Sequence, residues 1–524
     1  MHHLVNRARG RLLHLRREDG QTLVLVIMLI AMLSLLAALL IDTLLSSQTR
    51  SNSSATKADA RAAAEAGIDN YVSTLLLDNQ YYLQYLAPGE ATRQQTVVGS
   101  TTCNAASAKV SSVLPPSSPT AWPSSSGRSW CYPNGKDAWV DLGNGYSYDL
   151  ETFPGGTPAN SSNYLELIAT GRANSGGSAE DRQVLQVMIR PASVADYFMM
   201  TNADYDLGST ATVYGKVYSA QDVHFCGTGY ADVYAEGNVY FTGSCGGTGH
   251  LVPPATYYDS NSTPNIRSVI ASPINFSSFQ TSLDDISRAA KNAGGIYLNN
   301  PGGGVVAWQL TFNSAGTVSY RTCTAGTGRG MGGSTTIDAV QPQCTGSVTT
   351  ANVPTNGAIY SEIPVVIGGG TSSCTDPAPP DGGGVGNLSN ANCVHGHVTV
   401  ASNQDIIIGD DIGYVSDGND VLGMMAKNNV YVAEWAPTNL TWRGAVLAEN
   451  GQRSQSPDAC HNGCHGGTMT FSGSTASYNQ PYMDMFGTRN YNYDSTLQYL
   501  QPPWFPTLPQ AYTILLYRNL PNPS

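Results

Sequence analysis

The sequence is poor in charged residues and lacks the common catalytic signatures. Only 12% of its 524 residues are Asp, Glu, Lys or Arg, and the formal net charge is -12. An acidic balance argues against binding nucleic acid through a basic surface. Gly-x-Ser-x-Gly, His-Glu-x-x-His and the phosphate-binding Gly-x4-Gly-Lys-Ser/Thr pattern are all missing. These absences favour a binding or structural protein without a cofactor over an enzyme.

Only one long stretch is apolar and free of charge, from Thr22 to Ile41. As a helix it would rise about 30 Å, the thickness of the hydrocarbon core of a bilayer. No Ala-x-Ala site closes the run, so a retained segment fits better than a cleaved secretory signal. Five arginines precede it, which predicts a cytoplasmic N-terminus and a body in the cell envelope or outside the cell. We therefore expect a single-pass membrane protein with the lipid bilayer as one partner.

The residues after the apolar run predict a continuation of the same helix. Residues 43–77 contain no proline, and small or apolar residues recur at the spacing of one helix face. They are Ala60, Ala63, Ala64, Gly67, Ile68, Tyr71 and Leu75. The segment includes the run Ala63, Ala64, Glu65, Ala66, which resembles the signature of the PilX-type minor pilins, a group of type IV pilin-like proteins.

This resemblance covers roughly the first 80 residues and implies a specific maturation and assembly. It implies that prepilin peptidase cleaves after Gly20, so that Gln21 becomes the first residue, and that the partners are other pilin-like subunits. Gln21 and Leu25 depart from the family, in which Phe and Glu usually stand at these two positions. The missing glutamate argues for a minor subunit rather than a major fibre subunit.

Ten cysteines all follow the apolar run, and their number is even. An even count in an exported chain predicts disulfides, and the spacing suits bonds between neighbours, although the pairing stays open. The strongest metal candidate is CHNGCH at residues 460–465, with His395 and His397 as distant ligands, but a second cluster of the zinc type is missing. We expect disulfides and no metal. The cysteines are Cys103, Cys131, Cys226, Cys245, Cys323, Cys344, Cys374, Cys393, Cys460 and Cys464.

The second half of the chain contains a repeated frame. The segment GKVYSAQDVHF at residues 215–225 is echoed by ADVYAEGNVYF at 231–241, and the frame returns at 357–367. Further copies place Val400 six residues before Ile406, and Met424 six residues before Val430. Each unit predicts two short strands that cannot bury an inner face alone, so the units must stack. The pattern predicts a parallel β-solenoid, with a helical insertion at 275–295 and a hairpin at 308–320.

The expected fold is mainly β, with a long N-terminal transmembrane and stalk helix, a small antiparallel sheet and the parallel β-solenoid. The predicted parts are a basic leader (1–20), the transmembrane and stalk helix (21–85), a loop region with a pilin-like antiparallel sheet (86–193), the solenoid with its insertions (194–450) and a C-terminal cap (451–524). The arrangement after the stalk also resembles a family of large, uncharacterised bacterial exported proteins.

The repeated bends carry the carboxylates that an enzyme would need. Asp222 and Asp405 stand at the corner position that Asn238 and Asn429 occupy in other units. Asp and Asn at a bend are what turn geometry requires, so we expect a structural role. Calcium at residues 409–411 or 417–420 is left open, because no full calcium-loop pattern is present.

The sequence therefore predicts a membrane-anchored, pilin-like minor subunit of a type IV pilus or related filament. Its extracellular head would serve adhesion or assembly, with surface glycans as a candidate ligand. One alternative is a surface-tethered β-solenoid enzyme that acts on carbohydrate. The other is a static structural protein of the cell envelope.

Overall fold

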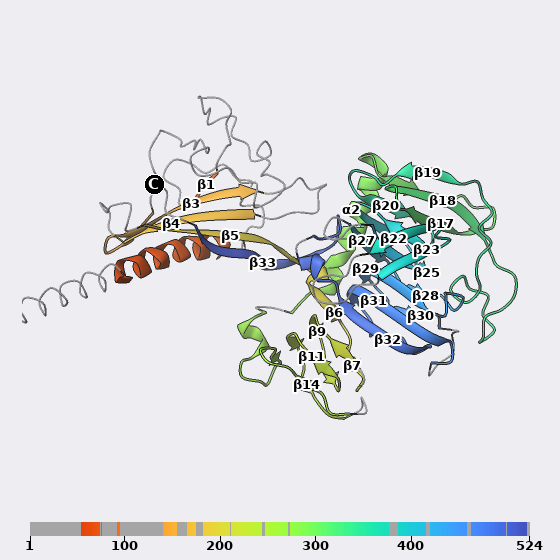
Figure 1. Cartoon of the computed structure of the whole chain (residues 1–524), viewed down its shortest axis with the longest axis horizontal. Helices are drawn as coiled ribbons and strands as arrows, with labels where there is room; N and C mark the ends of the chain where they lie inside the picture. The colour runs from red at the N-terminus through yellow and green to blue at the C-terminus, as the bar shows by residue number, and fades with distance from the viewer. Residues whose placement is uncertain are drawn as a thin grey trace, which may run out of the picture.

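The structure is a computed structural model in which β-strands are the dominant element. It describes residues 54–73, 75, 92–94, 140–154, 165–173, 182–209, 211–243, 247–270, 273–376, 386–415, 420–457, 459, 463–498 and 500–520. The α-helices in these ranges are one at residues 54–73 and 75, called the N-terminal helix below, and α2 (Gln280–Asn292). The molecule is elongated, with a helix on a small sheet at one end and a larger β body at the other (Figure 1).

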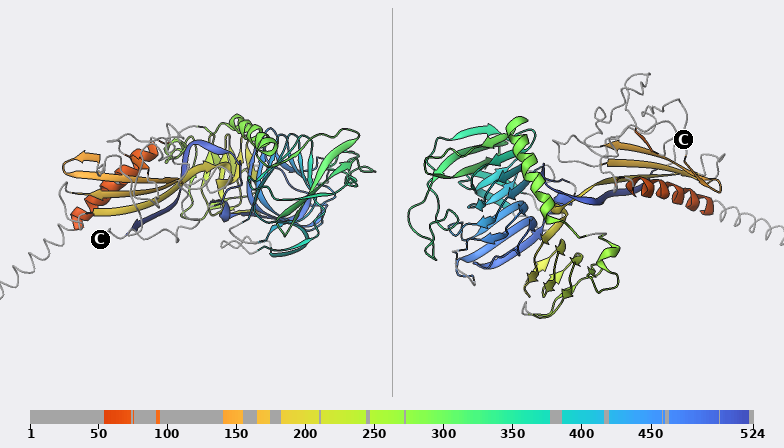
Figure 2. Two further views of the ribbon diagram at one scale, coloured as in Figure 1. Left: turned by 90° about the horizontal axis from the view of Figure 1, so that it is seen from above. Right: turned by 180° about the vertical axis from the view of Figure 1, so that it is seen from behind.

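The N-terminal helix lies along a six-stranded sheet, and together they are called the helix–sheet unit (Figure 2). The strands are β1 (Thr92–Gln94), β2 (Val140–Gly143), β3 (Tyr146–Pro154), β4 (Leu165–Arg172), β5 (Arg182–Ser193) and β33 (Thr507–Leu520). Only β1 pairs in parallel. Buried Ala64, Ile68 and Tyr71 of the helix pack on apolar residues of the sheet, as the helical spacing of small and apolar residues requires. Residues 507–520, within the predicted C-terminal cap, lie in this sheet.

The chain then winds into three short parallel stacks, which start after the 3-10 helix η7 (Val194–Asp196); two are three-stranded sheets, and the third is one end of a fourteen-stranded sheet. In the stacks, Val217 pairs with Val233, and Val223 pairs with Val239. Each pair joins equivalent positions of the repeated segments 215–225 and 231–241, as the repeat predicts. The strands are β6 (Tyr197–Thr201), β7 (Tyr205–Leu207), β8 (Thr212–Val213), β9 (Lys216–Ser219), β10 (Val223–Phe225), β11 (Thr228–Gly229), β12 (Val233–Ala235), β13 (Val239–Tyr240), β14 (His250–Leu251) and β15 (Tyr257–Tyr258).

The later repeats stack in two larger sheets. In one, Val400 of β24 lies between Ile359 of β20 and Met424 of β27. In the other, a column of buried residues starts with Val365 and Ile406 and continues to Val430. The strands are β16 (Ile296–Leu298), β17 (Val305–Asn313), β18 (Thr317–Thr324), β19 (Thr349–Asn352), β20 (Ala358–Ser361), β21 (Val365–Ile367), β22 (Ser372–Asp376), β23 (Gly386–Val394), β24 (His397–Ser402), β25 (Ile406–Ile408), β26 (Ile412–Tyr414), β27 (Val421–Ala426), β28 (Val430–Val432), β29 (Leu440–Ala448), β30 (Arg453–Gln455), β31 (Gly466–Ser477) and β32 (Phe486–Tyr493).

The prediction of a β-solenoid is nevertheless wrong, because the sheets do not close. The fourteen-stranded sheet runs from β15 at one end to β16 at the other, and the early strand β6 pairs with the late strand β31. The repeats thus do not follow one another along a single coil. Antiparallel pairs also interrupt the parallel stacking, at β17–β18–β19 and at β22–β23. A hairpin cannot continue a coil of parallel strands, so open sheets replace the predicted solenoid.

The predicted single-pass transmembrane anchor and membrane localisation must also be corrected. Among the helices of the residues described above, none is long and apolar enough to cross a membrane. The apolar run at residues 22–41 and the leader at 1–20 lie outside the described residues.

The helical insertion packs on the body, and the hairpin insertion extends one of its sheets by pairing β17 with β21. Phe276–Phe279 forms the 3-10 helix η9, after which α2 begins at Gln280 and buries Leu283 and Ile286. The hairpin β17–β18 turns at Gly316, whose φ of 75° suits glycine. Short 3-10 turns also lie at η8 (Ile266–Ser268) and η10 (Ser495–Gln498).

Candidate functional site

The signature residues Ala63–Ala66 lie where the N-terminal helix comes closest to its sheet. Ala63 and Ala64 are buried. A side chain on Gly171 of β4 would place its Cβ 1.9 Å from the carbonyl oxygen of Ala60. A Cβ on Gly67 would lie 2.5 Å from the ring of Tyr148. Small residues on both surfaces therefore set the distance between the helix and the sheet.

The signature glutamate joins the N-terminal helix to the last strand of the chain. Tyr517 of β33 donates its hydroxyl hydrogen to Glu65 Oε1 at 2.6 Å, and Arg61 Nε donates to the same oxygen at 2.9 Å. These hydrogen bonds, first from Tyr517 and then from Arg61, lower the pKa of Glu65. The resemblance to PilX-type pilins drew attention to Glu65, whereas nothing in the sequence indicated Tyr517 as its partner.

The repeated carboxylates hydrogen-bond to the backbone of the next repeat. Asp222 Oδ1 accepts from the backbone N–H of Asn238 at 2.7 Å, and Asp405 Oδ1 accepts from that of Asn429 at 2.9 Å. Burial raises the pKa of Asp405. Both carboxylates thus stabilise bends, which is what Asp does at turns. The expectation that the protein is not an enzyme stays a prediction.

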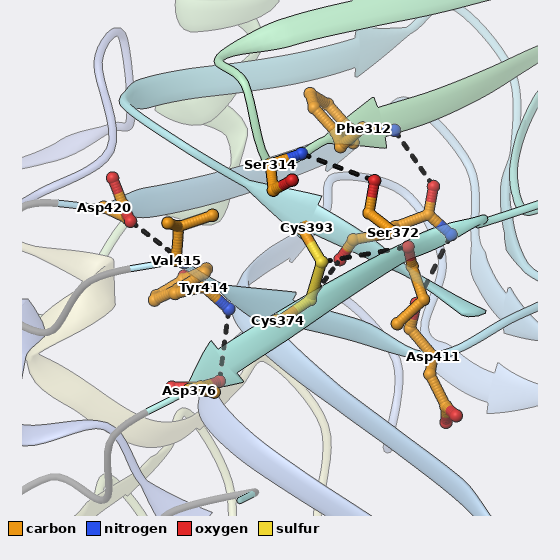
Figure 3. The surroundings of a disulfide bond; sticks show 12 residues. Phe312, Ser314, Ser372, Cys374, Asp376, Cys393, Asp411, Tyr414, Val415 and Asp420 are labelled. Carbon is orange, nitrogen blue, oxygen red and sulfur yellow. Dashed lines mark hydrogen bonds between the residues drawn. A yellow bond between two sulfur atoms is a disulfide. The ribbon is translucent and has the colours of Figure 1, made fainter. Parts of the chain in front are cut away.

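The structure places two disulfides in the body, Cys323–Cys344 and Cys374–Cys393. The second joins β22 to β23 (Figure 3). Cys226 and Cys464 are also disulfide-bonded. Disulfides are typical of compartments outside the cytoplasm. Four predicted cysteines lie outside the described residues: Cys103, Cys131, Cys245 and Cys460.

The metal candidates are engaged in other contacts. Cys464 is in a disulfide, so it is not a thiolate ligand, and His395 Nδ1 lies 3.3 Å from a carboxylate oxygen of Asp420. Asp410 Oδ2 accepts the backbone N–H of Gly370, and Asp411 Oδ1 accepts that of Thr441. Within the described ranges, no group of His, Cys, Asp and Glu is arranged to hold a metal ion. The calcium candidate at 417–420 lies largely outside those ranges.

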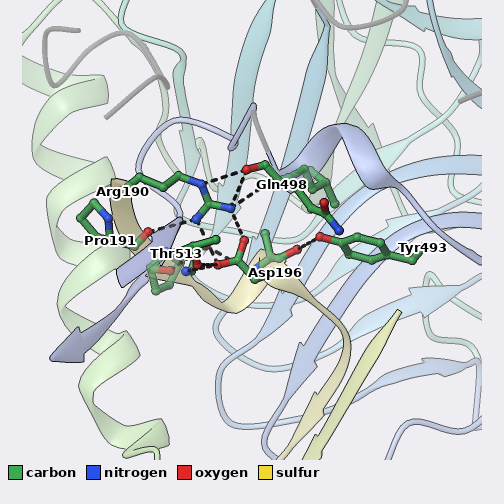
Figure 4. A network of polar contacts seen from close by, with 10 residues as sticks. Arg190, Pro191, Asp196, Tyr493, Gln498 and Thr513 are labelled. Carbon is green, nitrogen blue, oxygen red and sulfur yellow. Dashed lines mark hydrogen bonds and ion pairs between the residues drawn. The ribbon is translucent and has the colours of Figure 1, made fainter. Parts of the chain in front are cut away.

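The neck between the helix–sheet unit and the body contains a buried ion pair (Figure 4). Arg190 of β5 pairs with Asp196 of η7 through two nitrogens, and the side chains are 2% and 8% exposed. Arg190 also donates to the carbonyl oxygens of Gln498 and Pro191, while Asp196 accepts from Thr513 of β33. Two strands of the helix–sheet unit and the turn η10 therefore meet at this ion pair.

A second buried cluster holds two carboxylates around one arginine. Arg443 of β29 donates to both carboxylate oxygens of Asp494, at 2.8 and 2.9 Å, and to Asp376 Oδ1 at 2.5 Å. All three side chains are at most 1% exposed. Two carboxylates with one guanidinium leave an excess negative charge. Burial, together with the charge of Asp494, raises the pKa of Asp376 to about 6, although Arg443 opposes the change.

This raised pKa makes stability depend on pH. Because the folded state holds the Asp376 proton more tightly than the unfolded state, the stabilisation is complete below about pH 4 and is lost as pH rises through about 6. We expect denaturation midpoints of the full chain to fall across this window, by the equivalent of about 2 kcal/mol. Asp376→Asn should make that fall smaller, whereas Asp69→Asn on the exposed face of the N-terminal helix should leave it unchanged. An unchanged slope in Asp376→Asn would contradict this assignment.

A cavity of about 580 Å³ lies between the short parallel stacks and the body. It is lined by β7, β30, β32 and the loop at 480–484. Arg453 of β30 lines it at 3% exposure, with its guanidinium carbon 4.9 Å from the ring centre of Phe471 and 5.4 Å from that of Tyr491. Its Nε and Nη1 have no hydrogen-bond partner among the described residues.

Sequence reasoning missed this cavity, although one signal was present. Arg453 pairs with Val430 and so extends the column that starts with Val365 and Ile406. A charged residue in a column of buried aliphatic residues breaks the repeat. That break marks the position as one with a separate function.

Comparisons with known proteins do not establish a family. No family model matches the chain, and no curated protein matches it. One solved structure that aligns is the competence-associated pilin ComZ from Thermus thermophilus, at 12% sequence identity and a TM-score of 0.27. The alignment covers 89% of this chain and 97% of that chain. A TM-score this low does not show a shared fold.

Proposed function

We propose that the protein is a pilin-like minor subunit of a type IV pilus or a related filament, in which the β body is displayed beyond a helix–sheet unit. The observation that supports this proposal most is the fixed position of the signature helix. Ala63 and Ala64 are buried against the sheet, and Glu65 bonds to Tyr517 on the last strand. Both ends of the described chain thus meet in one small unit.

The exposed first residues of the N-terminal helix are available for contact with other subunits. Residues 54, 55 and 57–59 are exposed, and burial against the sheet begins at Ala60. The first turn of the described helix is therefore not covered by the sheet, and it lies at the end that leads to the apolar run at 22–41. We propose that this part of the chain contacts other pilin-like subunits, because exposed helix residues can pack on neighbouring helices.

The disulfides agree with a filament outside the cytoplasm. Cys323–Cys344 and Cys374–Cys393 brace the hairpins of the displayed body. Closing loops of about 20 residues stabilises a fold by roughly 3 kcal/mol each. Such bonds persist where thiols are oxidised, which is also where a filament is exposed.

The test is whether the protein matures and assembles as a pilin does. In native cells, we expect sheared filaments to contain the chain, with Gln21 as its first residue. Gly20→Arg should retain the leader and be missing from the filaments, because a bulky charged side chain would block cleavage after residue 20. Gly10→Arg, a matched change within the leader, should behave as wild type. Filaments without the chain, or an assembled chain that still begins at Met1, would refute the proposal.

A further inference from the structure

Arg453 is buried at a cavity wall and has no ionic partner within the described ranges. The Phe471 and Tyr491 rings lie within 5.4 Å of its guanidinium carbon, close enough for cation–π attraction. No carboxylate pairs with it among the described residues, and two of its nitrogens, Nε and Nη1, are buried and make no hydrogen bond there. The other buried arginines, Arg190 and Arg443, each pair with aspartate. An unpaired buried guanidinium is unfavourable unless something else supplies the acceptors.

Arginine is also an unexpected residue at this position for reasons of packing. Val365, Ile406 and Val430 precede it in the same column and are fully buried. A further aliphatic residue would extend the column and avoid the burial of a charge, which is often more stable. The arginine is therefore better explained by recognition than by stability.

The walls of the cavity indicate what kind of molecule Arg453 would bind. Tyrosine rings come from three segments, at Tyr205, Tyr482 and Tyr491. Asp206 accepts a hydrogen bond from Gln480 at 3.3 Å, and Asn490 lies on the same wall. The tyrosine rings can pack on apolar faces of a ligand, and the carboxylate and amide groups can bind its hydroxyl groups. About 580 Å³ is within the range of small-molecule sites.

We propose that this cavity binds an acidic sugar through its carboxylate, which would pair with the guanidinium of Arg453. A carboxylate matches the planar donors of arginine and carries a single charge. Asp206 and Asp484 line the same cavity together with Arg489, and the two carboxylates would repel a doubly charged phosphate more strongly than a carboxylate. The sugar ring would lie on the tyrosine faces. This inference is independent of filament membership, because it concerns the purified chain alone.

The experiment is calorimetric titration of the purified full chain with glucuronate and with N-acetylneuraminate. Glucose serves as the uncharged control, and glucose 6-phosphate as the control that carries a phosphate group. We expect at least one acidic sugar to bind, and to bind at least tenfold more tightly than either control. Arg453→Met should weaken that binding at least tenfold, whereas Arg288→Met on the exposed face of α2 should leave it unchanged.

The stability of the ligand-free variant provides an independent check. Arg453→Met places a flexible apolar side chain in an aliphatic column, so its melting temperature without sugar should equal or exceed that of wild type. The acidic sugar should raise the melting temperature of wild type only. No binding of either acidic sugar, equal binding of glucose, tighter binding of glucose 6-phosphate, or full binding by Arg453→Met would each overturn the proposal.

Discussion

Replacing Arg443 with methionine is expected to lower the free energy of unfolding by about 3–5 kcal/mol. The change removes three charge-assisted hydrogen bonds and leaves Asp376 and Asp494 buried without a counter-charge. It also removes the contact between the guanidinium and the ring of Tyr414, at 4.5 Å. Denaturant unfolding of the full chain, followed by tryptophan fluorescence, measures the loss, because the neighbouring Trp442 is fully buried.

Two comparisons separate charge from packing in this cluster. Arg288→Met removes an exposed pair with Asp285 and should cost less than about 1 kcal/mol. Adding Asp376→Asn and Asp494→Asn to Arg443→Met should restore much of the lost stability, because no buried charge is then left unpaired. A loss no larger than that of Arg288→Met would contradict the expected role of Arg443.

The register of the repeats could be predicted because it depends on local pattern. Val217 and Val233 hold the same place in segments sixteen residues apart, and an inward valine column requires them to align. The same six-residue spacing separates Val400 from Ile406 and Met424 from Val430. It predicts the observed pairing of Val400 with Met424 and of Ile406 with Val430. Whether the stacks close into a coil could not be predicted, since that depends on the long antiparallel pairs between them.

The contacts that join distant segments could not be predicted, because they produce no periodic pattern in the sequence. Tyr517 reaches Glu65 because β33 pairs with β5, and single residues at such junctions have no repeat to reveal them. Arg190 and Arg443 likewise find their aspartates only after the sheets are assembled. Arg453 is the exception, because its departure from the aliphatic column is visible once the repeats are aligned.

Replacing Arg190 with methionine is expected to separate the unfolding of the two ends of the molecule. The helix–sheet unit and the body have separate apolar cores. Arg190 links them at the neck by its pair with Asp196 and its bonds to carbonyl oxygens of η10 (Figure 4). Its loss leaves Asp196 buried, with Ser193 and Thr513 as its remaining donors, and should cost about 3–5 kcal/mol at the neck.

Calorimetry of the full chain measures this separation. With Arg190 in place, the buried neck couples the two cores, whereas in Arg190→Met we expect a new transition at lower temperature and faster protease cleavage between residues 190 and 197. The control is Arg518→Met in the neighbouring strand β33, which is exposed and bonds to the side chain of Gln186, and it should keep the wild-type profile. A single transition that only shifts would show that the neck does not carry the coupling. Because each core buries its own apolar residues, losing the link should reduce the cooperativity of unfolding between the two cores more than the stability of either core.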